Sequence, residues 1–154
     1  MVPILYTTST AILACAGMTD EDVSDAFITA RDLPRILSVD LFSWLPTHAD
    51  VYVLDTDTVT PQLRNNSDCL ILWCNYFAAA RLLDAALTIK QRETDGQSEF
   101  ERFTNPELTQ LAEAARNQAG VYRQTLITAL NSTDAITPMA VLSVVAPSYD
   151  PVTG

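Results

Sequence analysis

The sequence predicts an all-α fold, a bundle of about four helices with one long central helix. Apolar residues recur at steps of three and four over most of the chain, the longest such pattern contains a nearly continuous apolar stretch over residues 69–89, and helix-starting residues precede the patterns. With 154 residues, 48% of them hydrophobic, the chain is long enough to bury one core. We expect a helical domain over residues 1–131 and an extended C-terminal arm over residues 132–154.

The first part of the chain predicts two helices. A short helix covers Ser9–Ala16 and ends at Gly17. Residues 19–22 then offer a threonine cap and acids for a first turn, and a second helix continues to Pro46. Pro34 should kink this helix because proline removes one backbone donor and crowds the preceding turn. Its apolar stripe consists of Val23, Ala26, Phe27, Ala30, Leu33, Leu37, Leu41, Trp44 and Leu45.

Residues 47–60 are expected to form a loop, with a short strand over 51–55. Pro61 suits the first position of a long helix that runs to about Arg92. Because the middle of this helix is apolar on nearly every side, it must be covered on every side. A membrane span is disfavoured, since Arg81 and Asp84 would lie near the bilayer centre, where a charge costs at least about 2.5 kcal/mol. We expect a neighbouring subunit to cover what the chain's own helices leave exposed.

The last helix is expected to begin with Asn105 as its cap and Pro106 as its first residue, and to end near Asn131. Beyond it, residues 132–138 read as a loop, residues 139–146 are apolar enough for a strand, and the remainder has turn formers. The helix carries one stripe of apolar residues, namely Leu108, Leu111, Ala112, Ala115, Ala119, Tyr122, Leu126, Ala129 and Leu130.

The charge balance excludes a free-standing reader of duplex nucleic acid. The chain has 19 acidic and 9 basic residues, a formal net charge of −10, and its arginines are spread along the sequence without a basic patch. The acids either form an ordinary solvated surface or form a wall that faces other acids.

The sequence shows no catalytic or metal-binding motif, so we expect no enzymatic activity, cofactor or metal. His48 is the only histidine and is expected to be a solvated loop residue. Asp50, Asp55 and Asp57 could hold calcium, but their spacing matches no calcium loop and a closing glutamate is missing. The three cysteines are expected to be reduced core residues, at positions Cys15, Cys69 and Cys74.

Three stretches together carry a family resemblance: TSTAILACAGMTDEDVSDAFITA, the long apolar helix running into TDGQSEFERF, and NPELTQLAEAARNQA. In helix order, helix lengths and loop positions the whole chain resembles the small helical head-to-tail adaptor proteins (head-completion or connector proteins) of tailed bacteriophages. The resemblance implies a virion protein at the head–tail junction that is present in the host cytoplasm during assembly. It also implies a dodecameric ring that binds the portal protein and a tail or nozzle protein. Packaged DNA would pass through the channel without specific binding, and no membrane would be involved.

In such a ring, the connection between the two long helices is expected to lie at one end of the bundle and to contact a neighbouring subunit. Asp95 and Gly96 would make the turn, the two phenylalanines that follow would anchor on the neighbour, and arginines would pair with glutamates across the boundary. The alternative is that both phenylalanines pack inside their own bundle. The expected inter-subunit residues are Arg92, Glu99, Phe100, Glu101, Arg102 and Phe103.

The resemblance also implies that the C-terminal segment is an arm that binds the portal; the alternative is a disordered tail. Acidic groups at residues 20–25 and 50–57 are the candidates to line the channel, where they would repel DNA and let it slide. A different class of function, an acidic inhibitor that imitates DNA, also explains the charge but leaves the apolar helix and tail unused. The expected arm residues are Ala146, Pro147, Ser148, Tyr149, Asp150, Pro151 and Val152.

Overall fold

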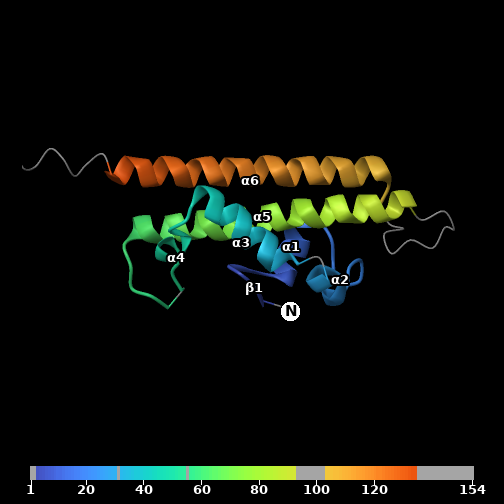
Figure 1. Cartoon of the computed structure of the whole chain (residues 1–154), viewed down its shortest axis with the longest axis horizontal. Coiled ribbons are helices and arrows are strands. Elements are labelled where there is room, and N and C mark those ends of the chain that lie inside the picture. Colours follow the sequence, from blue (N-terminus) through green and yellow to red (C-terminus); the bar gives the residue numbers. More distant parts are fainter. Residues whose placement is uncertain (1–2, 31, 55, 93–102, 135–154) are drawn as a thin grey trace, which may run out of the picture.

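The all-α prediction is confirmed. The computed structural model describes residues 3–30, 32–54, 56–92 and 103–134, and over these residues the protein is a helical bundle with a small N-terminal hairpin (Figure 1). The elements are β1 (Pro3–Ile4), β2 (Thr7–Thr8), α1 (Ser9–Ala16), α2 (Asp25–Ala30), α3 (Leu33–Trp44), α4 (His48–Val51), α5 (Pro61–Arg92) and α6 (Asn105–Asp134). The two strands pair antiparallel.

The central helix α5 contacts most of the other elements, and α1 also contacts α6. α6 runs along one side of α5 over most of its length, and α1, α3, α4 and the hairpin lie on the other side (Figure 1). Trp73 and Leu83 of α5, Leu37 of α3 and Leu108 of α6 are among the buried side chains of one continuous core. The long antiparallel pair α5–α6 therefore forms the frame on which the short helices pack.

The chain's own helices cover α5, so the expectation that a neighbouring subunit must cover it was wrong. The three alanines at residues 78–80 are buried, and the larger apolar side chains of α5 are buried or half-buried. Within the described residues the exposed large hydrophobic side chains all lie on other parts of the chain: Leu5, Ile36, Val39, Phe42, Leu54 and Val121.

By length and composition, α5 is also the one helix in the described part that could cross a membrane. Its mean hydropathy reaches 1.3 over an 18-residue stretch, of which 56% is buried inside the protein. The core helix of a water-soluble protein meets the same criterion, and α5 lies in the core, so this property is weak evidence for a span.

Local signals set the ends of α1 as expected. The Thr8 hydroxyl accepts a hydrogen bond from the Ala11 N–H at the start of the helix. Gly17 adopts a left-handed conformation (φ 69°) at the end, where its N–H returns to the last turn. A left-handed residue after the last turn is most easily supplied by glycine, because glycine has no Cβ.

The predicted kinked helix over residues 19–45 is instead two helices. Residues 19–22 form a turn in which the Asp22 carboxylate accepts from the Thr19 N–H at 2.8 Å, and α2 begins only at Asp25. Pro34 lies in the first turn of α3, where a missing N–H leaves no helix hydrogen bond unmade. Proline therefore starts a new helix here, and α3 ends before Pro46 as predicted.

The expected strand over residues 51–55 is not formed in the described positions. Val51 ends the short helix α4, Tyr52 is extended, and residues 52–54 belong to no helix or strand. The Ser67 hydroxyl of α5 accepts from the Val53 N–H at 3.0 Å and thus takes the place of a neighbouring strand. An apolar alternation alone cannot supply the second strand that a ladder needs.

The cap of α6 lies one residue earlier than expected. Thr104, not Asn105, is the capping residue: its N–H and hydroxyl donate to the Glu107 carboxylate, and its Oγ1 accepts from the Glu107 N–H. Pro106 lies in the first turn. The helix continues to Asp134, past the boundary expected at Asn131, and the apolar stripe predicted for it is buried or half-buried.

Candidate binding groove between α3, α5 and α6

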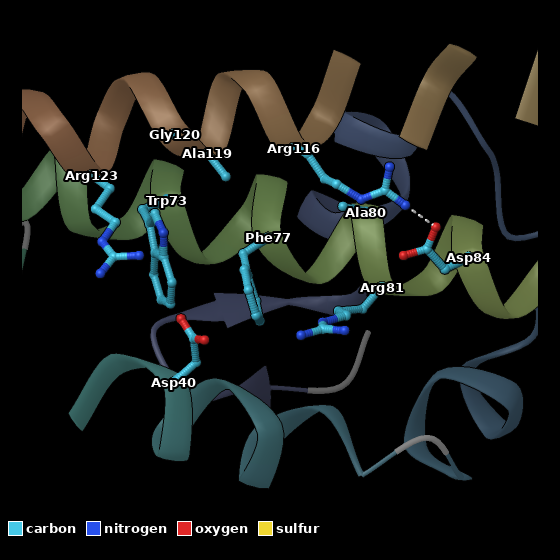
Figure 2. A pocket seen from close by; sticks show the side chains of 10 residues that line it. All are labelled: Asp40, Trp73, Phe77, Ala80, Arg81, Asp84, Arg116, Ala119, Gly120 and Arg123. Atoms are coloured by element: carbon cyan, nitrogen blue, oxygen red, sulfur yellow. Dashed lines mark hydrogen bonds and ion pairs between the residues drawn. The ribbon is translucent and has the colours of Figure 1, made fainter. Parts of the chain in front are cut away.

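A groove of about 320 Å³ lies where α3 faces the α5–α6 pair (Figure 2). Small side chains on facing turns leave the space: Ala80 on α5, and Ala119 and Gly120 on α6. A Cβ added at Gly120 would meet nothing within 4 Å, so the groove is open there. The lining residues are Asp40, Trp73, Phe77, Ala80, Arg81, Asp84, Arg116, Ala119, Gly120 and Arg123.

Aromatic rings form one wall of the groove. Trp73 and Phe77 point from α5 toward α3 (Figure 2) and stack with their centroids 5.0 Å apart. Trp44 at the end of α3 meets Trp73 edge to face at 5.1 Å. The indole Nε1 of Trp44 is buried and has no hydrogen-bond partner among the described residues. Stacked rings buried against one another give the groove a rigid apolar wall.

Two arginines lie on this aromatic wall. The guanidinium of Arg81 is 5.1 Å from the centroid of Phe77, and that of Arg123 is 5.0 Å from the centroid of Trp44. Neither makes an ion pair with a residue in the described ranges. A guanidinium that stacks on a ring keeps its N–H donors in its own plane, where they remain available to a carboxylate or phosphate.

A third arginine is already paired. Arg116 of α6 forms an ion pair and hydrogen bond with Asp84 of α5, marked by the dashed line in Figure 2. Both side chains are partly exposed, so this pair contributes little to stability. Its effect is to fix one side of the groove while Arg81 and Arg123 remain open to an incoming group.

A second hollow, of about 410 Å³, continues the groove along α3 and shares Asp40 and Arg81 with it. It is lined by Asp32, Arg35, Ile36, Val39, Asp40 and Arg81. We call the two together the arginine groove. Arg35 pairs with Asp32 at 3.9 Å, and both side chains are mostly exposed.

The expectation that the arginines form no patch was wrong in three dimensions. Four of the five arginines whose side chains the structure describes line the arginine groove; the fifth is Arg64. Spacing held a partial signal, since Arg116 and Arg123 are seven residues apart and so share one face of α6. Sequence alone does not show that this face meets Arg81 of α5 and Arg35 of α3.

Of the expected inter-subunit residues, the structure describes the side chain of Phe103 only. It is 9% exposed and belongs to the core of its own bundle, and the Lys90 ammonium donates to its carbonyl oxygen. For Phe103 the alternative of packing inside the bundle therefore holds. Arg92 ends α5, and nothing further is described of it. Asp95, Gly96, the residues from Glu99 to Arg102 and the arm residues 146–152 lie outside the described residues.

His48 is not the solvated loop residue that we expected. It begins α4, and its Nδ1 lies 2.6 Å from the Tyr6 hydroxyl in a hydrogen bond. Tyr6 also stacks on Tyr52 at 4.5 Å. The pKa of the Tyr6 phenol is raised, mainly by burial and to a smaller extent by the neighbouring Cys74 and Tyr52. This cluster fastens the hairpin to α4 and is a structural contact.

The aspartates near α4 form no ligand set in the described part of the chain, where no group of three side chains could hold a metal ion. The Asp57 carboxylate accepts from the Leu54 N–H at 2.8 Å and so closes a turn. Asp55 lies outside the described residues.

The cysteines are free thiols, as expected. Cys74 is buried, and burial raises its pKa to about 12; Cys15 and Cys69 are half-buried, with pKa values that burial also raises. A thiol with so high a pKa is a poor nucleophile.

Comparisons with protein-family models, with curated proteins and with solved structures find no match to this chain.

Proposed function

We propose that this protein is a structural subunit of a tailed-bacteriophage particle: a head-to-tail adaptor that forms a ring beneath the portal, extends the DNA channel and joins the capsid to the tail. The observation that carries the proposal is a group of exposed apolar side chains on α3, which we call the α3 face. Ile36, Val39 and Phe42 lie on one side of this helix and are 36%, 67% and 66% exposed. Ile36 and Val39 line the arginine groove, and Phe42 lies beside Val39 on the same helix.

Single exposed apolar residues are normal on a protein surface, but a group of them on one helix face is a different feature. Protein interfaces are enriched in aromatic residues and arginine, and their strongest contacts come from such side chains. The α3 face carries the exposed ring of Phe42, and its residues Ile36 and Val39 line one hollow together with Arg81, whose guanidinium stacks on Phe77. These are the features of a surface that binds protein.

The architecture supports the same proposal. Two long antiparallel helices with short helices on one side have the order and lengths that the adaptor resemblance implies. The net charge of −10 suits a channel through which DNA slides, because acidic walls repel phosphates and make no lasting contacts. In this proposal the arm residues 146–152 bind the portal, and the exposed acids Asp50 and Asp57 are candidates for the channel wall.

Electron microscopy of the protein alone, and of the protein mixed with the portal protein of the same virus, tests the proposal. We expect rings, either free or seated on the portal, and loss of portal attachment when residues 146–154 are removed while the helical content stays the same. The proposal would be refuted if the protein remained monomeric and did not bind the portal protein. A salt-sensitive one-to-one complex with a basic DNA-binding protein would instead favour the DNA-mimic alternative.

A further inference from the structure

We infer that the α3 face of one copy docks into a specific acidic hollow on a second copy. This inference rests on the proposed function and names the two surfaces that would join neighbouring subunits. The donor surface consists of the exposed apolar side chains of α3 and the arginines beside them. The receiving surface lies beside α1, at the turn that precedes α2.

The receiving surface is a hollow of about 300 Å³ with an apolar floor and an acidic rim. Leu13 and Met18 line it and are each 4% exposed. Asp20 and Asp25 also line it, and Glu21 is exposed in the same turn. The full lining is Ser9, Thr10, Leu13, Ala14, Met18, Thr19, Asp20 and Asp25. We call it the acidic hollow.

Charge decides which partner fits the donor surface. Copies with a net charge of −10 repel one another, so a stable contact between them must bring a local excess of positive charge onto acids. Arg81 makes no ion pair with any described residue, and the same is true of Asp20 and Glu21. The unpaired cation on one surface and the unpaired acids on the other are therefore complementary.

Shape selects the same partner. A phenyl ring or a valine side chain needs an apolar recess, and the acidic hollow offers one beside its carboxylates. The acids around Asp57 fit an incoming arginine less well, because a cation of the same chain is already there: the Arg64 guanidinium donates to the backbone carbonyl oxygens of Asp57 and Leu54. The acidic hollow therefore matches Ile36 and Val39 in apolarity and the adjacent Arg81 in charge, whereas the Asp57 region does not match Arg81.

The two surfaces are made of different residues, so the contact is heterologous. When the α3 face of one copy occupies the acidic hollow of the next, the first copy still has a free hollow and the second still has a free α3 face. The same contact can then repeat and close into a ring.

A charge-swap experiment tests the inference. Arg81→Glu and Glu21→Arg are made separately in the full-length protein, and sedimentation velocity over a concentration series measures self-association. We expect each variant alone to associate about tenfold more weakly than the wild type. An equimolar mixture should associate as the wild type does, because the glutamate introduced in one variant then faces the arginine introduced in the other, while the unaltered halves still fit each other.

Two controls carry the same changes in net charge outside both surfaces. Asp68→Arg matches Glu21→Arg, and the double variant Gln118→Glu/Thr125→Glu, on exposed positions of α6, matches Arg81→Glu. At physiological salt, both controls should associate about as strongly as the wild type, in contrast to the variants that they match. Circular dichroism checks that all variants remain folded.

A mixture that associates no better than its separate components would overturn the inference. If the wild type forms rings or binds the portal while both single variants do so equally well, the inferred contact is wrong and the proposed function stands. If the wild type neither self-associates up to its highest soluble concentration nor binds the portal, the proposed function fails as well.

Discussion

Two phenylalanines in opposite environments give the most direct test of the structure. Phe103 is 9% exposed in the core, whereas Phe42 is 66% exposed on the α3 face. Replacement of a buried phenylalanine by alanine removes its transfer free energy and leaves a cavity, at a total cost of about 3–5 kcal/mol. Phe103 lies at the end of the bundle, just before α6, so we expect Phe103→Ala to cost about 3 kcal/mol.

The same substitution at Phe42 should leave stability nearly unchanged. Only about a third of its side chain is buried, and a third of about 1.5–3 kcal/mol is about 0.5–1 kcal/mol. Alanine favours a helix over phenylalanine by about 0.5 kcal/mol, which offsets most of that loss. Phe42→Ala should instead weaken self-association, because its ring belongs to the proposed docking face.

Urea unfolding followed by circular dichroism measures both effects. With a slope near 2 kcal/mol per molar urea, Phe103→Ala should lower the midpoint by about 1.5 M, and Phe42→Ala by less than about 0.3 M. Equal losses for the two variants would contradict the burial that separates them. An unchanged midpoint for Phe103→Ala would show that this ring is not part of the core, and would return it to the inter-subunit role.

Three further outcomes follow from single contacts. Thr7 donates to Asn75 in the buried interior, so Thr7→Val should cost about 1–3 kcal/mol, and a double-mutant cycle with Asn75→Leu should show coupling between the two sites. Hydrogen bonds from the Thr104 N–H and hydroxyl hold the pKa of Glu107 below its ordinary value of 4.5. The charge of Glu107 therefore stabilises the fold above the unfolded-state pKa, and this contribution disappears as the pH falls through the folded-state pKa. The free energy of unfolding of Glu107→Gln should be lower than that of the wild type at neutral pH and approach it in acid. Cys74 should react with a thiol reagent only after unfolding, and rapid labelling of Cys74 in the native protein, followed by mass spectrometry, would contradict its burial.

Helix ends that depend on one local residue were predictable from the sequence. Gly17 ends α1 and Pro61 starts α5, since glycine readily adopts the left-handed conformation, proline fixes its own φ, and neither needs a partner. The end of α2 and the start of α3 were harder, because a proline has different effects in the middle and in the first turn of a helix. The spacing of apolar residues is the same in both cases, so the stripe around Pro34 could not decide between them.

The arginine groove could not be predicted, because it is a property of packing. Arg35, Arg81 and Arg116 are far apart in sequence and meet only where three helices come together. The same limit explains the error about α5. An apolar helix shows in its sequence that it must be covered, but the sequence does not show whether α6 and the short helices suffice. Here they do, and the exposed apolar surface lies on α3 instead.

This shift changes the kind of interface that a ring would need. An uncovered α5 would have required a large, permanent apolar contact, without which the subunit would not stay soluble. A few exposed side chains on α3, with Arg81 beside them, suit a smaller contact between subunits that are already folded. Such a contact is weak for one pair, and the net charge of −10 opposes it further at long range. In a closed ring, however, the last subunit makes two contacts at once, and the second forms at a high effective concentration. Two acidic subunits that share one such contact would therefore dissociate readily, whereas a complete ring would be stable.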